Sequence, residues 1–167
     1  PRGFMREERF ALPGGSIEER AALDRRLRWG WLRSPGATTP PASIADPDRE
    51  WRETRWSGLL DLPLEGDYVF YLKAMGAYRM TLAGEPLFAN ADTTIPQHLG
   101  RETRHLKPGL YFMEIALTPD ARGEGVMRLF WQWPAEGRAM APFDSEYLLP
   151  REPGRIERAA TRLRRHA

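Results

Sequence analysis

Residues that could perform acid–base, nucleophilic or metal chemistry are few and scattered in this chain of 167 residues. It has three histidines, His98, His105 and His166, and no cysteine. No HExxH motif or other metal-ligand spacing joins the histidines, and the sequence lacks a GxSxG motif, a phosphate-binding glycine run and a nucleotide fingerprint. We therefore expect no metal site, no cofactor and no cysteine nucleophile, while the lack of cysteine leaves the redox compartment open.

Carboxylates are the remaining candidates for catalysis, and the conspicuous ones stand at expected turns. Aspartate is favoured at turns because its side chain bonds to the nearby backbone. A carboxylate pair for sugar hydrolysis would be recognised only from its separation in space. Nothing in the sequence singles out such a pair, so we expect that the chain is not an enzyme. The aspartates concerned are Asp61, Asp67, Asp92 and Asp120.

Aromatic and basic side chains point to a different chemistry, the binding of sugars. A flat aromatic ring presents an apolar face that stacks on a sugar ring, and polar groups can serve its edge. Trp29 and Trp31 flank a glycine, and Trp133 follows a late strand. Arg101 and Arg104 belong to a polar stretch and could hydrogen-bond to sugar hydroxyls, the alternative being a solvated strand edge. These five residues are the candidate ligand-binding positions.

Strands dominate from residue 51 to residue 150, where apolar residues alternate between turns rich in glycine and proline. Short strands with regular turns predict an all-β fold, an antiparallel β-sandwich of jelly-roll-like form. The residues expected to share the core face are Tyr68, Phe70 and Leu72, then Met80 and Leu82, and finally Met127, Leu129 and Trp131, with Trp133 extending this last face beyond the core strand.

Short helices are expected at both ends of the sandwich. Residues 16–19 read as a capping box, and residues 16–28 then run as a short helix, with Ile17, Leu23 and Leu27 as its apolar positions. Residues 34–48 hold four prolines and predict a loop. The resulting division is a helical lead-in at 1–28, the sandwich at 29–150, and an Arg-rich helix or linker at 151–167.

The distribution of charge argues against a nucleic-acid partner. The chain has a net charge of +2, but residues 151–167 alone carry six arginines and two glutamates, which leaves a net charge of −2 on the other 150 residues. The body of the protein is therefore not basic. The Arg-rich end could touch an anionic membrane surface or a partner, the alternative being a solvated terminal helix.

Five motifs in order resemble the protective-antigen-type β-sandwich domain, a module of bacterial toxins, fungal adhesins and glycosidases. The resemblance spans roughly residues 51–150 and places Trp56 and Trp131 at the core tryptophan positions of that family. A weaker similarity at WGWLRSP, near residue 30, fits the family's first strand. The motifs are RWSGLLDLPLEGDYVFYL, RMTLAGEPLF, HLKPGLYFMEIAL, MRLFWQWP and YLLP.

The resemblance implies a sugar-binding function for some members, in which two adjacent aspartates at a hairpin tip help to hold a calcium ion. Calcium requires several oxygen ligands, which carboxylates supply. In this chain the corresponding stretch, residues 73–77, reads Lys-Ala-Met-Gly-Ala, and Ala83 stands where members often carry aspartate. We therefore expect no calcium at this tip.

These observations predict a non-catalytic, extracytoplasmic accessory module of a larger bacterial protein, on the cell surface or in the periplasm. Its expected ligand is a glycan bound without calcium, and the other domains of its parent protein are its expected partners. The alternative is a structural spacer or protein-docking module, which an exposed apolar patch would favour.

Overall fold

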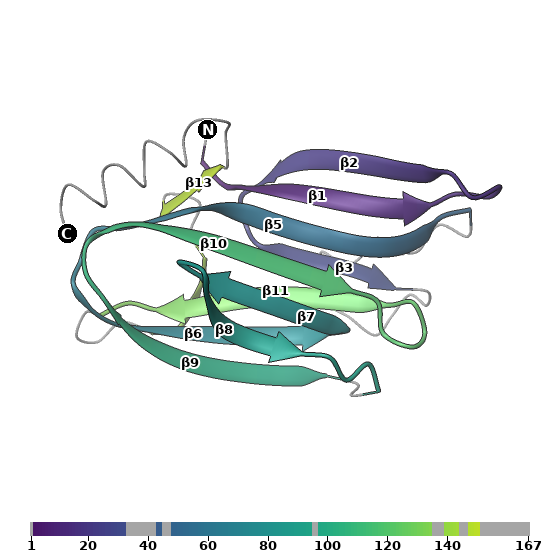
Figure 1. Cartoon of the computed structure of the whole chain (residues 1–167). Coiled ribbons are helices and arrows are strands. Elements are labelled where there is room, and N and C mark those ends of the chain that lie inside the picture. The colour runs from purple at the N-terminus through teal and green to yellow at the C-terminus, as the bar shows by residue number, and fades with distance from the viewer. Residues whose placement is uncertain are drawn as a thin grey trace.

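The computed structural model describes residues 2–32, 43–44, 48–94, 97–134, 139–143 and 147–150. Within these ranges the chain is all-β, without an α-helix, and its strands form two sheets that pack face to face (Figure 1). The predicted β-sandwich is therefore confirmed. None of the described residues form a helix long and apolar enough to cross a membrane.

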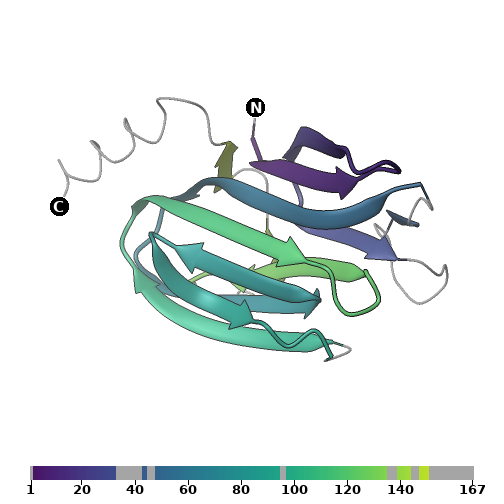
Figure 2. The ribbon, with the colours of Figure 1, turned by 45° about the vertical axis from the view of Figure 1, so that its right-hand side comes forward.

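The two layers differ in size, and Figure 2 shows them one above the other. Sheet A consists of β1 (Phe4–Ala11), β2 (Ile17–Asp24), β5 (Glu50–Leu62), β7 (Ala77–Leu82), β8 (Glu85–Asn90), β10 (Gly109–Thr118) and β13 (Leu148–Pro150). Sheet B consists of β3 (Arg28–Leu32), β4 (Ser43–Ile44), β6 (Gly66–Met75), β9 (His98–Leu106), β11 (Gly125–Gln132) and β12 (Ala141–Pro142).

The strand order brings together segments that are far apart in the sequence. Sheet A runs β2-β1-β5-β10-β7-β8, with β13 paired to β5. Sheet B runs β4-β3-β11-β6-β9, with β12 paired to β11. The short β3–β4 pair is parallel, and the other described pairs are antiparallel.

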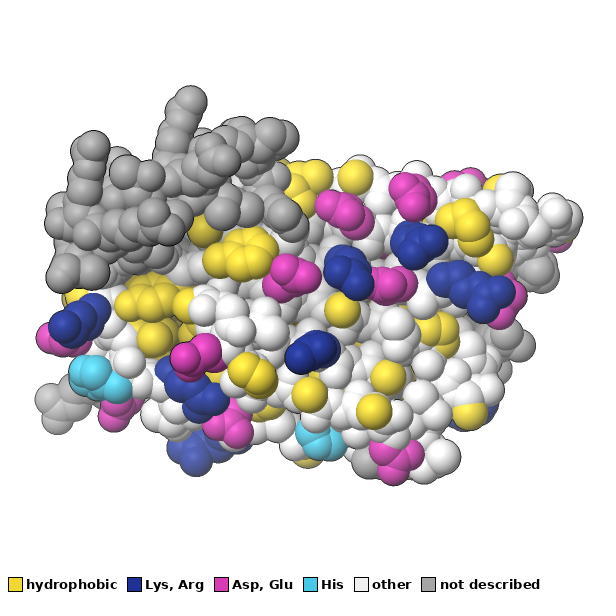
Figure 3. Space-filling model, viewed as in Figure 1, with side chains coloured by type: hydrophobic (Ala, Val, Ile, Leu, Met, Phe, Trp, Pro, Cys, Tyr) yellow, Lys and Arg dark blue, Asp and Glu magenta, His cyan; other side chains and the backbone are white. Residues whose placement is uncertain are grey.

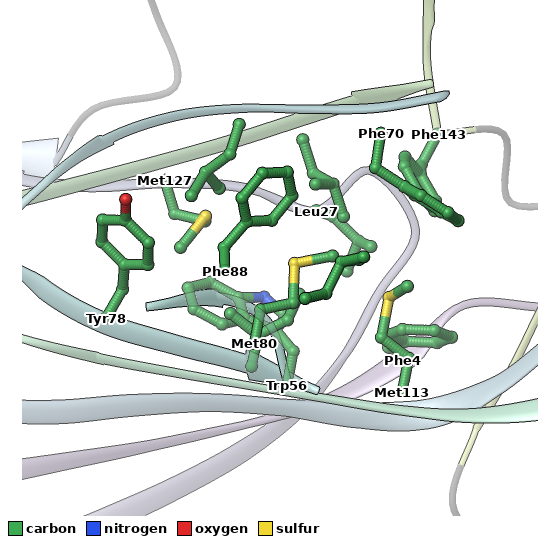
Figure 4. Packing of buried hydrophobic residues seen from close by; sticks show 14 of the residues in the cluster. Phe4, Leu27, Trp56, Phe70, Tyr78, Met80, Phe88, Met113, Met127 and Phe143 are labelled. Carbon is green, nitrogen blue, oxygen red and sulfur yellow. The ribbon is translucent and has the colours of Figure 1, made fainter. Parts of the chain in front are cut away.

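The core lies between the sheets and takes one face of each strand, as the alternation of apolar residues predicts. Figure 4 shows side chains of both sheets meeting there, among them Trp56 and Met113 from sheet A and Phe70 and Met127 from sheet B. Every residue assigned to the core face from the sequence is buried. This burial turns the intervening residues of β6 and β11 outward.

The hairpin β7–β8 has a tight turn at the glycine of the motif RMTLAGEPLF. Strand β7 ends at Leu82 and β8 begins at Glu85, so only Ala83 and Gly84 connect them. Both have positive φ, 53° and 82°, which is the backbone of a two-residue hairpin turn that follows the twist of the strands.

The expected N-terminal helix at residues 16–28 is wrong. Residues 17–24 form strand β2, which pairs with β1 along its whole length, from Ala11 opposite Ile17 to Phe4 opposite Asp24. A turn with Gly14 and Gly15 at φ of 91° and 92° reverses the chain between them. The pairing with β1 outweighs the helix preference of this segment, which is rich in alanine, glutamate and arginine, because propensity yields readily to tertiary contacts.

Asp24 ends β2 as a buried acceptor that joins sheet A to the bend before β3. Its side chain is 5% exposed. Oδ2 accepts hydrogen bonds from Trp56 Nε1 at 2.9 Å and from Arg6 Nη1 at 3.0 Å. Oδ1 accepts bonds from the backbone N–H groups of Arg26 at 2.9 Å and Leu27 at 3.0 Å. Asp24 thereby holds the bend that leads the chain from β2 into β3.

The predicted Arg-rich helix or linker at residues 151–167 lies outside the described residues. Its contact with a membrane or a partner, and the proposed domain division, stay predictions.

Candidate functional site

The three tryptophans expected at a ligand surface lie inside the sandwich. Trp29, Trp31 and Trp133 are 7%, 9% and 8% exposed. The Trp29 ring centroid lies 4.5 Å from that of Trp51, and the Trp133 centroid lies 4.3 Å from that of Tyr147. Buried rings offer little area for stacking on a sugar. A ligand contact by these tryptophans stays a prediction. The exposed side chains that could contact a ligand lie on the outer face of sheet B.

The two candidate arginines lie on opposite faces of β9, because residues three apart in a strand point in opposite directions. Arg104 is half-buried and engaged: Nη1 lies 3.0 Å from Glu102 Oε2, and the guanidinium also donates to the carbonyl oxygens of Thr103 and Pro86. Arg101 is exposed on the outer face of sheet B. The structure therefore does not bring Arg101 and Arg104 together at one site.

Arg101 borders a hollow of about 350 Å³ on the outer face of sheet B, which we call the Tyr71 hollow. Strand pairing builds it: Tyr71 of β6 lies opposite Phe130 of β11 on one side and Arg101 of β9 on the other. The next outward residue of β6, Lys73, lies opposite Leu99. The residues that line the hollow are Tyr71, Leu72, Lys73, Leu99, Gly100, Arg101, Phe130 and Met140.

The floor of the hollow is aromatic and its border is mixed. Tyr71 is half-buried, and its hydroxyl donates a hydrogen bond to Gln132 Oε1 at 3.3 Å, which orients the ring. The guanidinium carbon of Arg101 lies 5.9 Å from the Tyr71 ring centroid, within the range of a cation–π contact. Leu99 is 70% exposed and Met140 54% exposed. The hollow thus combines an aromatic floor, two cations and two exposed apolar side chains.

Sequence reasoning missed Tyr71, Lys73 and Phe130 as site residues, although it placed Tyr71 on the face opposite the core. The available signal was a large aromatic residue at a solvent-facing position of an alternating strand. Its opposition to Phe130 depends on the pairing of β6 with β11, segments about sixty residues apart, which the sequence does not display.

The β6–β7 hairpin tip, which holds calcium in sugar-binding members of the family that this sequence resembles, is held here by hydrogen bonds within the protein. Gly76 alone separates β6 from β7, and Asn90 Nδ2 donates to its carbonyl oxygen at 3.5 Å. Asp92 lies in the following loop, where the hydroxyl and then the backbone N–H of Thr94 donate to it and hold the pKa of its carboxyl below its ordinary value. No group of three or more potential metal ligands occurs among the described residues.

The four aspartates expected at turns have polar partners, and only two of them lie in loops. Asp120 accepts bonds from two backbone N–H groups of its own loop, and Asp92 is bound by Thr94 as described. Asp61 lies near the end of β5 and Asp67 near the start of β6, on either side of the intervening turn. Asp67 Oδ1 lies 2.9 Å from His105 Nδ1, and Asp61 Oδ2 lies 3.9 Å from Arg2 Nη1.

Comparison with known proteins identifies the fold. Neither a protein-family model nor a curated protein sequence matches the chain. Among solved structures, an anti-sigma factor domain-containing protein superposes with a TM-score of 0.67 at 18% identity, over 91% of this chain and 48% of that chain. The PA14 domain of the antifreeze protein MpAFP superposes with a TM-score of 0.59 at 14% identity, over 91% of this chain and 93% of that domain. The fold is that of a PA14 domain.

The predicted resemblance to the protective-antigen-type sandwich is thereby confirmed for the fold. A PA14-like region also occurs within a glycoside hydrolase: the α-xylosidase of Xanthomonas citri superposes with a TM-score of 0.52 at 13% identity, over 86% of this chain but 16% of the enzyme. The chain likewise spans about half the length of the anti-sigma protein. The PA14 fold therefore occurs both as nearly a whole solved chain and as a small part of a larger one.

Proposed function

We propose that this PA14-fold chain is a non-catalytic accessory module that binds a glycan without calcium in the Tyr71 hollow. The observation that carries the proposal is the cross-strand pair of Tyr71 and Phe130 on the outer face of sheet B, with the exposed Arg101 beside it. Aromatic faces stack on the apolar faces of sugar rings, and a guanidinium donates several hydrogen bonds to hydroxyl oxygens. Neither contact requires a metal ion.

The parent of this module is proposed to be a larger bacterial protein outside the cytoplasm. Support comes from the resemblance to modules of surface and secreted proteins and from the PA14-like region that forms 16% of the α-xylosidase chain. Under this proposal the module holds its parent near a glycan, and any chemistry belongs to other domains.

Docking of a protein is the second candidate, and the exposure of Leu99 and Met140 favours it. Exposed apolar side chains beside an aromatic floor are typical of protein contacts. Glycan binding and protein docking differ in their expected response to replacement of Leu99. Docking would use the apolar surface of Leu99, whereas sugar stacking relies on the aromatic rings.

The replacement Tyr71→Ala is expected to weaken glycan binding at least about tenfold, because it removes the stacking surface. The matched variant Tyr71→Phe keeps the ring and should bind within a few-fold of the natural protein. Affinity electrophoresis against a panel of neutral and acidic polysaccharides, run with calcium and with a chelator, measures both variants. We expect the same affinities in both conditions.

Three outcomes would count against this proposal. Loss of binding in the chelator would mean that a metal ion participates. Equal binding by natural protein and Tyr71→Ala would place the glycan elsewhere. No binding to any polysaccharide, together with a partner protein that is lost on Leu99→Ser, would favour docking.

A further inference from the structure

The outer face of sheet B differs from the outer face of sheet A in its charge. On sheet A the signs alternate and pair: Arg55 forms ion pairs with Glu53 and Glu114, and Arg9 forms one with Glu19. Figure 3 shows acidic and basic side chains interspersed on that face. A second hollow there, of about 250 Å³, is lined by residues of both signs. The acidic and basic side chains named here on the outer face of sheet A therefore compensate one another's charge.

Among the described residues, positive charge dominates the outer face of sheet B around the Tyr71 hollow. Among outward residues of its described longer strands β3, β11, β6 and β9, the only carboxylate is Asp67. Asp67 pairs with His105 and lies six residues along β6 from Lys73, about 20 Å away. Neither Lys73 nor Arg101 forms an ion pair with a carboxylate of the described residues.

Strand register places further cations beside Lys73. Lys73 lies opposite Arg128 of β11, which lies opposite Arg28 of β3. Arg28 and Arg128 each have interactions of their own, so the two cations available to a ligand of the hollow are Lys73 and Arg101.

We infer that the glycan bound in the Tyr71 hollow is acidic, a polyuronate whose carboxylate Arg101 and Lys73 hold while its sugar ring stacks on Tyr71 and Phe130. This inference rests on the proposed function and names its ligand class. A guanidinium fits a carboxylate with two parallel hydrogen bonds, and Arg101 already lies beside the Tyr71 ring. Lys73, two residues along β6 from Tyr71, adds a second charge-assisted hydrogen bond.

A single-stranded nucleic acid also combines anionic groups with rings that stack. The size of the hollow favours the polyuronate. Its two lining cations, Lys73 and Arg101, lie beside one aromatic floor, which suits the carboxylate of one sugar, whereas a single-stranded nucleic acid requires a basic groove along several nucleotides. Nucleic acid is therefore an outcome that the experiment must separate from the polyuronate.

The decisive comparison uses paired ligands with the same polymer backbone: alginate and polygalacturonate, each against its carboxyl-reduced, uncharged form. Isothermal titration calorimetry of the full chain at about 50 mM and about 300 mM salt measures the affinities. At least one polyuronate should bind about tenfold or more tightly than its reduced form, and higher salt should weaken only the charged polymer. Oligo-dT of similar length is the nucleic-acid arm.

Charge-removing variants identify the residues responsible. Arg101→Gln and Lys73→Gln should each lower polyuronate affinity about tenfold, and the double variant should bind charged and reduced polymers alike. The matched controls are Arg79→Gln, an exposed arginine of sheet A, and Lys107→Gln, at an exposed turn. Both controls remove one positive charge and should leave the preference unchanged.

Each alternative result has a separate meaning. If both polyuronates bind no better than their reduced forms, the acidic ligand class is wrong, while the proposed glycan function stands if any panel glycan binds through Tyr71. If controls and site variants lose affinity equally, the preference reflects net charge alone and the inference is wrong. Oligo-dT binding as tight as the polyuronate would replace it with a nucleic-acid site.

Discussion

Replacement of Asp24 by alanine is expected to lower the free energy of unfolding by about 3–5 kcal/mol, because it removes the acceptor of a buried charged network. Two donors are side chains, Trp56 and Arg6, and two are backbone N–H groups of the bend before β3. A buried donor without a partner costs about 1–3 kcal/mol. Urea unfolding followed by circular dichroism measures the loss.

Two variants test the reason for this expected loss. Asp24→Asn keeps the shape and one oxygen acceptor, so it should cost less than Asp24→Ala. Glu19→Ala, on the same strand but 73% exposed, should change stability by less than about 0.5 kcal/mol, because exposed ion pairs contribute little. If Asp24→Ala were as mild as Glu19→Ala, the network would not hold the β2–β3 bend.

The second large effect is expected at Trp131, where alanine should cost about 3–5 kcal/mol. Its indole is 2% exposed, and its centroid lies 4.5 Å from that of Phe143, in stacked geometry, and 5.1 Å from that of Trp133. Removing the ring leaves a cavity between β11 and the segment that follows it. Guanidinium chloride unfolding measures the change from the midpoint and slope.

The sequence neighbour of Trp131 supplies the matched control for this prediction. Phe130 lies on the opposite face of β11 and is half-buried, so Phe130→Ala should cost clearly less stability while weakening glycan binding. Trp131→Phe should recover part of the stability. A loss at Trp131 no larger than the loss at Phe130 would contradict the assignment of these two faces.

The same pair links the fold to the proposed function. Adjacent residues of a strand point to opposite faces, so packing of Trp131 inside the sandwich presents Phe130 outside, toward the partner strand that carries Tyr71. The core thereby sets the orientation of the Tyr71 hollow. A variant that loosens the core without unfolding the chain should therefore weaken binding as well.

Much of the sandwich could be predicted from the sequence, because the pattern that predicts a strand lies within the strand itself. The alternation of Tyr68, Phe70 and Leu72 has the period of a strand and reports directly which face is buried, and all three are buried. The Ala83-Gly84 turn was readable for a similar reason, since a glycine between two alternating runs indicates a turn. Such signals require no knowledge of distant partners.

The N-terminal segment was not readable in this way. Its apolar residues are few, and Ser16 with Glu19 matches a helix start as well as the first residues of a strand after a turn. The deciding contact is the β1–β2 hairpin, in which β2 is an edge strand whose exposed charged residues leave only a weak alternating pattern. A pairing partner, rather than intrinsic preference, selects the strand.

The alternation and order of motifs along this chain predict the all-β class, the faces of the central strands, the resemblance to the PA14 fold and the absence of paired aspartates at the β6–β7 tip. Only the folded chain shows that Trp29, Trp31 and Trp133 are buried, that Arg101 and Arg104 lie on opposite faces, and that Tyr71 lies opposite Phe130. Side-chain alternation is encoded within each strand, whereas register and neighbour order arise from contacts between strands that are distant in sequence.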